Sequence, residues 1–281
     1  MSAVVMDGKG LAEKVKAQIR EKVSKMRRQP GLAVILVGAD PASQVYVRNK
    51  EKDCEECGIQ CYDYRLPQDT TQEEVLALVT KMNNCDAVDG ILVQLPLPSQ
   101  INERVVLEAI APEKDVDAFH PENVGRIMQG QAYYKPCTPA GVMEMLHEYG
   151  IDPAGKHCVV VGRSNIVGKP TAMLLLHENA TVTICHSKTP DLKAHCCQAD
   201  ILVCAVGKQG LITADMVKPG AVVVDVAMNR NEMGKLCGDV EFAPVCEVAS
   251  YITPVPGGVG PMTRAMLMEN TYQASQRRNS K

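Results

Sequence analysis

Short apolar runs alternate with longer stretches of helical periodicity along most of this chain. Residues 31–38 predict a buried strand, residues 41–57 a helix and residues 60–66 a second strand. The same alternation gives helices at residues 8–27, 71–82 and 102–110, and strands at residues 90–95, 158–161, 181–185, 201–205 and 221–226. Such an order is typical of parallel sheets covered by helices. The sequence therefore predicts an α/β fold.

These elements form two groups along the chain, which predicts two domains. Thr138-Pro139 precedes an apolar helical stretch, and we expect Thr138 to be an N-cap with Pro139 at the first helical position. We place an α/β domain at residues 1–139 and a Rossmann-like, doubly wound parallel sheet at residues 140–261. The last predicted helix, within residues 262–281, is expected to return to the first domain.

Composition restricts the partners and the compartment. The net charge is −3 without a long run of one sign, which argues against a nucleic-acid surface. No apolar stretch approaches about 18 residues, and the N-terminus lacks a signal-like segment, so we expect no membrane partner and a cytoplasmic location. Twelve cysteines in such a chain predict reduced thiols. Cys54-x-x-Cys57 with Cys61 lacks a second well-spaced pair, so we expect no metal site.

A glycine-containing turn joins an apolar strand to a helix at residues 159–170. Gly162 allows a tight turn, and Gly168 allows helix and strand to approach closely. Ser164 and the N–H groups at the helix start can face an anion. We interpret this segment as the phosphate-binding turn of a dinucleotide-binding domain. The alternative is a purely structural glycine turn.

The predicted strand at residues 181–185 ends where a dinucleotide fold places the residue that meets the adenosine ribose. An Asp or Glu there would select NAD. Here the chain has His186, Ser187 and Lys188, with Arg163 in the preceding turn. Positive charge and hydroxyl donors suit a 2′-phosphate, which predicts NADP as the cofactor. The alternative is a set of solvated surface cations.

One face of the helix predicted at residues 41–57 carries a single charge. By spacing of three and four, this face contains Ser43, Tyr46, Lys50, Cys54 and Cys57. A lysine in an apolar wall loses hydration, so its pKa falls towards a value useful for proton transfer. Tyr46, one turn away, can hold it by a hydrogen bond. The alternative is a lysine whose long stem carries its amine to solvent.

Two further stretches carry polar groups into apolar surroundings. Gln94 interrupts an apolar strand end, where ligands gather in open α/β sheets, and it is placed to touch substrate or Lys50. Residues 114–121 contain the alternate carboxylates Asp115 and Asp117, one of which can bind a basic ring edge. For Gln94 the alternative is a strand-end amide whose hydrogen bonds are all satisfied within the protein. For residues 114–121 the alternative is a surface turn.

Taken together, five ordered motifs resemble the bifunctional methylenetetrahydrofolate dehydrogenase/cyclohydrolase family, through essentially the whole chain. The motifs are Tyr46-Val47-Arg48-Asn49-Lys50, residues 90–98, Lys114-Asp115-Val116-Asp117, residues 162–170 and residues 254–263. The resemblance implies two α/β domains, a homodimer and two reactions. NADP⁺ takes a hydride from 5,10-methylene-tetrahydrofolate, and water then opens the 5,10-methenyl cation to 10-formyl-tetrahydrofolate.

The same resemblance implies roles for individual residues. Lys50 is the catalytic residue for water addition, Tyr46 orients it, Gln94 tunes it, and Asp117 binds the pterin. The substrate-binding positions are Ser43, Tyr46, Leu95, Pro96, Asp117, Pro256, Gly257, Gly258, Val259 and Gly260. The cofactor-binding positions are Gly162, Arg163, Ser164, Val167, Gly168, Ser187 and Met228.

The chain departs from the family pattern at three positions. Ala118 and Ala227 stand where the family usually has glycine, and Met228 stands where an aliphatic residue is common. If either glycine serves a positive φ, alanine there costs on the order of 1 kcal/mol. Two other functions stay open: a monofunctional or NAD-preferring dehydrogenase, and a non-catalytic dinucleotide-binding regulatory module with no use for Lys50.

Overall fold

A computed structural model describes residues 2–279, except for the side chains of residues 41–43, 45, 46 and 279. The chain divides into two compact units. The six-stranded unit contains the residues up to Ala12 together with Thr138–Thr263, and the three-stranded unit contains Glu13–Cys137 and the residues from Arg264 onwards. The chain therefore passes from one unit to the other three times.

The three-stranded unit is built on a parallel sheet in the order β3-β2-β4. The central strand β2 (Gly31–Val37) is buried at every residue, as its unbroken apolar run predicts. It pairs with β3 (Gln60–Leu66) on one side and β4 (Gly90–Val93) on the other. Because all three strands run parallel, their carboxyl ends meet at one edge of the sheet.

Helices connect these strands and supply most of the remaining unit. They are α1 (Gly8–Ser24), which begins in the other unit, α2 (Pro41–Cys57), α3 (Gln72–Asn83), α4 (Glu103–Glu108), α5 (Pro121–Met128) and the greater part of α10 (Val259–Asn279). Thr71 and Glu74 form a capping box at the start of α3. Asn102 caps α4 by accepting from the N–H of Arg104.

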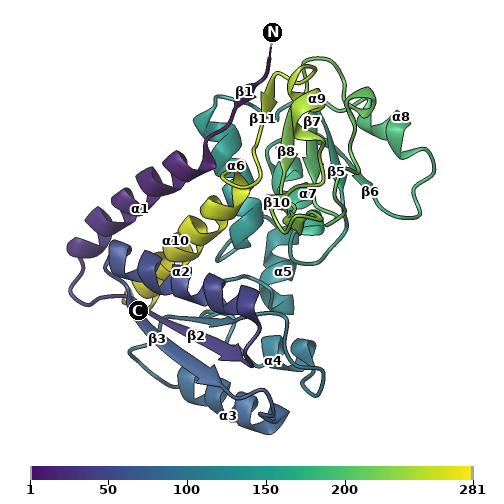
Figure 1. Ribbon diagram of the computed structural model, residues 1–281. Coiled ribbons are helices and arrows are strands. Elements are labelled where there is room, and N and C mark those ends of the chain that lie inside the picture. The colour runs from purple at the N-terminus through teal and green to yellow at the C-terminus, as the bar shows by residue number, and fades with distance from the viewer. Residues whose placement is uncertain (1, 280–281) are drawn as a thin grey trace. The chain divides into compact units, whose positions relative to one another are not determined.

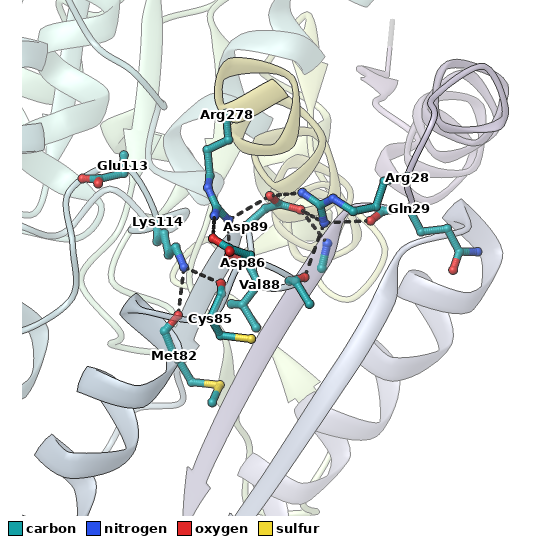
Figure 2. Close-up of polar contacts among 12 residues, drawn as sticks. Arg28, Gln29, Met82, Cys85, Asp86, Val88, Asp89, Glu113, Lys114 and Arg278 are labelled. Carbon is teal, nitrogen blue, oxygen red and sulfur yellow. Dashed lines mark hydrogen bonds and ion pairs between the residues drawn. The ribbon is translucent and has the colours of Figure 1, made fainter. Parts of the chain in front are cut away.

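The far end of α10 is attached to this unit by an ion-pair network around Asp89 (Figure 2). Asp89, fully buried, accepts two hydrogen bonds from the Arg28 guanidinium at 3.0 and 2.7 Å. Arg278 of α10 donates to the same carboxylate at 3.1 Å, and the N–H of Gly31 donates at 2.9 Å. The prediction that the last helix returns to the first group of elements is confirmed by these contacts.

The six-stranded unit holds a parallel sheet in the order β1-β11-β8-β7-β5-β6. Its strands are β1 (Val4–Val5), β5 (His157–Val161), β6 (Thr181–Cys185), β7 (Ile201–Cys204), β8 (Val222–Asp225) and β11 (Tyr251–Ile252). In Figure 1 the first strand, in purple, lies beside β11 near the other end of the colour scale. The prediction of a doubly wound parallel sheet is confirmed.

The strand order places a topological switch point between β5 and β7. If β5, β6, β7, β8 and β11 are numbered 1 to 5 in chain order, they lie in the sheet in the order 2-1-3-4-5. Folds with this order bind ligands in the crevice beyond the carboxyl ends of strands 1 and 3, which are β5 and β7 here. The other elements are α6 (Cys137–Glu148), α7 (Gly168–His177), α8 (Leu192–Cys196), α9 (Phe242–Cys246), a 3₁₀ turn at Ala214–Met216 and the hairpin of β9 (Asn229–Arg230) and β10 (Leu236–Cys237).

Two helix starts differ from the predicted positions. Helix α6 begins at Cys137, so the prediction of Thr138 as its N-cap is wrong. The Thr138 hydroxyl lies 2.9 Å from the hydroxyl of Thr263 instead. Helix α10 begins at Val259, and Pro261 falls in its first turn. Proline is tolerated there because N–H groups of the first turn have no partner within the helix. Among the described residues, no helix is long and apolar enough to cross a membrane.

Candidate active site

Lys50 lies on the face of α2 that packs into the three-stranded unit. Cys54 and Cys57 of the predicted stripe are fully buried, whereas Lys50 is only partly so. The predicted stripe is therefore confirmed for the members that the structure describes. The side chains of Ser43 and Tyr46 lie outside the described residues. Burial along this face is what lowers the pKa of Lys50 from its ordinary value.

The amide of Gln94 meets the amine of Lys50. Strand β4 ends at Val93, and the N–H of Gln94 continues its ladder by donating to the carbonyl of Ile35 at 2.8 Å. Lys50 Nζ donates to Gln94 Oε1 at 2.8 Å, and Gln94 Nε2 donates to the carbonyl of Leu95 at 2.7 Å. The second bond fixes the amide with its oxygen towards the lysine. The predicted contact between Gln94 and Lys50 is confirmed.

Asp117 supplies the acidic group of this site. Its carboxylate accepts a hydrogen bond from the Cys137 thiol at 3.5 Å. Burial raises the pKa of Asp117, and the charge of Lys50 opposes that rise. Burial lowers the pKa of Lys50, and Asp117 and Cys137 oppose that fall. Both groups are thus moved towards their neutral forms. Cys137 was not predicted, because it is 20 residues from Asp117 and nothing in its local pattern distinguishes it.

The neighbouring charges of residues 114–121 hold the local backbone. Lys114 is buried and donates to the carbonyls of Met82 and Cys85 at 2.9 and 2.8 Å, where α3 ends (Figure 2). Asp115 accepts from the N–H of His120 and from the Asn123 amide, both at 2.8 Å. Of the two alternate carboxylates, Asp117 is therefore the one paired electrostatically with Lys50.

Ala118, directly after Asp117, adopts a left-handed backbone conformation with φ of 58°. It is fully buried. An alanine in this region costs about 1–2 kcal/mol because its Cβ approaches the following carbonyl. The conformation explains why glycine suits this position. The chain accepts that strain beside one of its candidate site residues.

The glycine turn of the six-stranded unit has the two geometries that its sequence predicts. Gly162 has φ of 131°, and a Cβ there would overlap the carbonyl oxygen of Ala205. A Cβ on Gly168 would overlap the carbonyl oxygen of Gly162. The first approach brings the turn after β5 against the loop after β7, and the second packs the start of α7 against the turn itself. The turn therefore lies at the switch point of the sheet.

Ser164 has a more local task than predicted. Its hydroxyl accepts hydrogen bonds from the N–H groups of Val167 and Gly168, both at 3.2 Å. In this structure the serine hydroxyl occupies these two N–H groups, and their contact with an anion stays a prediction. Ser164 itself is exposed, as are Arg163 and the next two residues of the turn. These exposed groups are what the turn offers to a ligand.

The end of β6 lies beside the glycine turn. Val161 pairs with Cys185 across the two strands, and the N–H of Gly162 donates to the Cys185 carbonyl at 2.8 Å. Ser187 and Lys188 follow and are exposed. His186 Nδ1 accepts from the N–H of Lys188 at 3.1 Å. The hydroxyl and cationic groups predicted for a 2′-phosphate are thus presented to solvent after adjacent strand ends.

Asp239 was not predicted, although it shapes the loop after β7. Its carboxylate accepts hydrogen bonds from the N–H groups of Val206, Gly207 and Lys208 at 2.7, 3.1 and 2.6 Å. The amide of Asn229 adds a fourth donor at 3.1 Å. Because Asp239 is fully buried, this charge depends on those donors. No local sequence signal joins it to a loop more than 30 residues away.

The remaining predicted positions lie near the end of β8 and after β11. Ala227 lacks a positive φ, and its N–H donates to the buried carboxylate of Asp225 at 3.1 Å. Met228 is 44% exposed, and its sulfur would lie 3.8 Å from a Cβ on Gly260. Pro256–Gly260 belongs to the six-stranded unit, where the carbonyl of Gly257 accepts from the N–H of Lys9 at 3.0 Å.

Comparisons with known proteins match both units. Residues 6–117 match the catalytic-domain model of tetrahydrofolate dehydrogenase/cyclohydrolase, and residues 136–279 match the NAD(P)-binding-domain model of the same family. Bifunctional protein FolD of Ruminiclostridium cellulolyticum is 58% identical over 277 residues, with 98% of each chain covered. The crystal structure of the bifunctional FolD of Campylobacter jejuni is 51% identical, with a TM-score of 0.96 over 99% of this chain and 100% of that one. The Trypanosoma brucei dehydrogenase-cyclohydrolase, solved with NADP and an inhibitor, is 40% identical, with a TM-score of 0.95 over the full length of both chains.

Proposed function

This chain belongs to the tetrahydrofolate dehydrogenase/cyclohydrolase family, and on that premise we propose which of its residues perform the two reactions. The chain is a bifunctional enzyme that oxidises 5,10-methylene-tetrahydrofolate with NADP and hydrolyses the 5,10-methenyl product to 10-formyl-tetrahydrofolate. The observation that carries our residue assignment is the hydrogen bond between Lys50 and Gln94 at a partly buried amine.

We assign the hydrolysis step to Lys50 as general base. The methenyl substrate is a cation, so a permanently charged ammonium would repel it, whereas a neutral amine can accept a proton from attacking water. A neutral amine has two N–H groups and one lone pair. With one N–H donated to Gln94 Oε1, the lone pair stays available for the water proton. Burial lowers the pKa of Lys50 and so favours this neutral form.

The other residues of the three-stranded unit bind and orient the folate in this proposal. Asp117 binds the pterin, as a carboxyl group held by the Cys137 thiol can do. Tyr46 and Ser43 come from the start of α2, and Leu95 and Pro96 follow Gln94. The family resemblance also assigns folate binding to Pro256, Gly257, Gly258, Val259 and Gly260.

NADP fits the groups that the six-stranded unit presents. The residues that would hold it are Gly162, Arg163, Ser164, Val167, Gly168, Ser187 and Met228. The close backbone approaches at Gly162 and Gly168 support this assignment, since a side chain at either position would fill the turn. Exposed Arg163 and Ser187 favour the 2′-phosphate of NADP over the ribose hydroxyls of NAD. When bound, the cofactor accepts the hydride.

A lysine substitution tests the assignment. In Lys50→Met we expect hydrolysis of methenyl-tetrahydrofolate, followed by its absorbance and corrected for the spontaneous rate, to fall at least about a hundredfold. Oxidation of methylene-tetrahydrofolate by NADP⁺ should continue, since hydride transfer depends mainly on positioning. Lys52→Met is the matched control, because Lys52 lies on the exposed side of the same helix.

Each result decides between the proposed roles. Retained hydrolysis in Lys50→Met would refute Lys50 as the base. Absent hydrolysis in the unsubstituted enzyme, with hydride transfer intact, would leave a monofunctional dehydrogenase. A comparison of rates with NADP⁺ and NAD⁺ decides the cofactor preference.

Assembly and location complete the proposal. We propose a homodimer, as the family resemblance implies, and sedimentation should then give twice the chain mass of 30.5 kDa. We also propose a cytoplasmic enzyme, which is supported by twelve cysteines that are all free.

A further inference from the structure

Arg264 of α10 binds the turn of α2 that carries Lys50. Its Nη1 donates to Asp53 Oδ2 at 2.8 Å and to the carbonyl of Asn49 at 3.4 Å. Asn49 directly precedes Lys50, and Asp53 follows it by three residues. The guanidinium therefore bridges the two ends of the helical turn on which the amine is mounted.

The anchor of this guanidinium is a buried carboxylate shared by two helices. Asp53 is 2% exposed, and its second oxygen accepts from Lys16 of α1 at 2.8 Å. Lys16 also pairs with Glu56, which in turn pairs with Lys52. Removing either partner of a buried carboxylate is costly, which holds Arg264 in place.

The charged and titratable groups that act on Lys50 come from four elements. Asp117 lies between α4 and α5, Cys137 begins α6, Cys54 is one turn along α2, and Arg264 is on α10. The first three favour the protonated lysine, whereas burial and the charge of Arg264 disfavour it. Gln94 is neutral and contacts the amine directly. Arg264 is thus the cation of this set, and its charge persists at every assay pH.

We propose that Arg264 is a positioning residue for the hydrolysis step, which fixes the turn of α2 around Lys50 and keeps positive charge beside its amine. The proposal rests on the role proposed above for Lys50. It assigns no contact with substrate to Arg264 itself. Its consequence is that the second reaction is more sensitive to Arg264 than the first.

The pH profile of hydrolysis separates this role from a structural one. Removing the charge in Arg264→Gln should raise the pKa of Lys50, so the acidic limb of the profile should move upwards by about half a pH unit. At neutral pH, hydrolysis should then fall about threefold, because a smaller fraction of Lys50 is neutral. NADP⁺-dependent oxidation should change less than twofold. Arg264→Lys, which keeps a charge within reach of Asp53, should restore the acidic limb.

The matched control is Arg278→Gln. Arg278 lies on the same helix and also donates to a buried carboxylate, that of Asp89, so the control removes an equal charge and a comparable ion pair (Figure 2). It should weaken thermal stability without moving the profile. If Arg264→Gln does not fold, Arg264→Met, which keeps the length of the side chain, provides the same measurement.

The outcomes are distinct. A profile of Arg264→Gln that coincides with that of Arg278→Gln would overturn the proposal, and an equal shift in Arg264→Lys would do the same. Absent hydrolysis in the unsubstituted enzyme would refute the role of Lys50 instead. The proposed role of Arg264 is supported if the acidic limb moves to higher pH in Arg264→Gln or Arg264→Met but stays in place in Arg264→Lys and Arg278→Gln.

Discussion

Gln94 Oε1 accepts a hydrogen bond of 2.8 Å from Lys50, while the other end of the same amide donates to the carbonyl of Leu95. The amide is therefore bound at both ends and cannot reverse without losing two hydrogen bonds. A neutral acceptor at this distance orients the amine without fixing its charge. A carboxylate at the same place would fix the charge.

Gln94→Glu is expected to suppress hydrolysis by keeping Lys50 protonated. An opposite charge within hydrogen-bond distance raises a lysine pKa by about one to three units. The acidic limb of the hydrolysis profile should move upwards by at least about one pH unit, with a loss of about tenfold at neutral pH. Gln60→Glu, at the exposed start of β3, controls for the added charge. Identical profiles for the two variants would contradict a direct action of Gln94 on Lys50.

Ala118→Gly should relieve the left-handed strain next to Asp117. The buried Ala33 of β2 provides the comparison, because both alanines are fully buried in the three-stranded unit and only Ala118 has a positive φ. Each substitution loses a buried methyl group and adds backbone entropy to the unfolded chain. We expect Ala118→Gly to be the more stable variant by about 1–2 kcal/mol in urea unfolding. Equal losses would mean that the strain at Ala118 is negligible.

Asp225 should make the six-stranded unit less stable as pH rises from about 4 to 6. Burial raises the pKa of Asp225 to about 6, although three backbone N–H groups donate to it. In that pH window the folded state keeps a proton that the unfolded state has released. The stability that Asp225 contributes is therefore fully present below the pKa that Asp225 has in the unfolded chain. It is lost as pH rises through the pKa of Asp225 in the folded state.

Asp225→Asn should remove that pH dependence. Thermal unfolding from pH 4 to 6.5 should show a difference between wild type and variant that changes by up to about 3 kcal/mol across the window. The variant starts from lower stability because the amide NH₂ faces backbone N–H groups that donate to the carboxyl group in the wild type. A constant difference would show that Asp225 ionises in the folded enzyme as easily as in the unfolded chain.

Asp239→Asn should loosen the loop after β7. The amide presents an NH₂ group to backbone donors that now bind a carboxylate, so amide exchange at Val206, Gly207 and Lys208 should accelerate. If this loop lines the cofactor crevice, the Kd for NADP⁺ should rise about tenfold or more. Asp215→Asn is the control, because Asp215 forms an exposed ion pair with Lys193 in the same unit. Faster exchange with unchanged affinity would separate the loop from cofactor binding.

Local features of the site were predictable because local sequence encodes them. The unbroken apolar run of β2, the single charge on a face of α2, and the two close-approach glycines follow from periodicity and side-chain volume. The family resemblance added which reaction these features serve. Ser164 shows the limit, because a serine in a turn can bind a ligand or its own helix, and its spacing does not decide between them.

Partners far apart in the sequence were not predictable. Arg264 and Asp53 are 211 residues apart, and Asp239 lies 31 residues from the loop that it holds. Each of these residues alone resembles an ordinary surface charge in the sequence. The pairing of β1 with β11 has the same origin, since two valines carry no information about a strand formed some 250 residues later.

The three passages of the chain between the units impose an order on synthesis. Emerging from its N-terminus, the chain completes β2, β3 and β4 early, yet the partner that Arg278 supplies to Asp89 emerges only after the whole six-stranded unit. Strand β1 likewise waits for β11. Neither unit can be finished on the ribosome before the other is nearly complete, so β1 stays unpaired and Asp89 lacks one of its partners for most of translation.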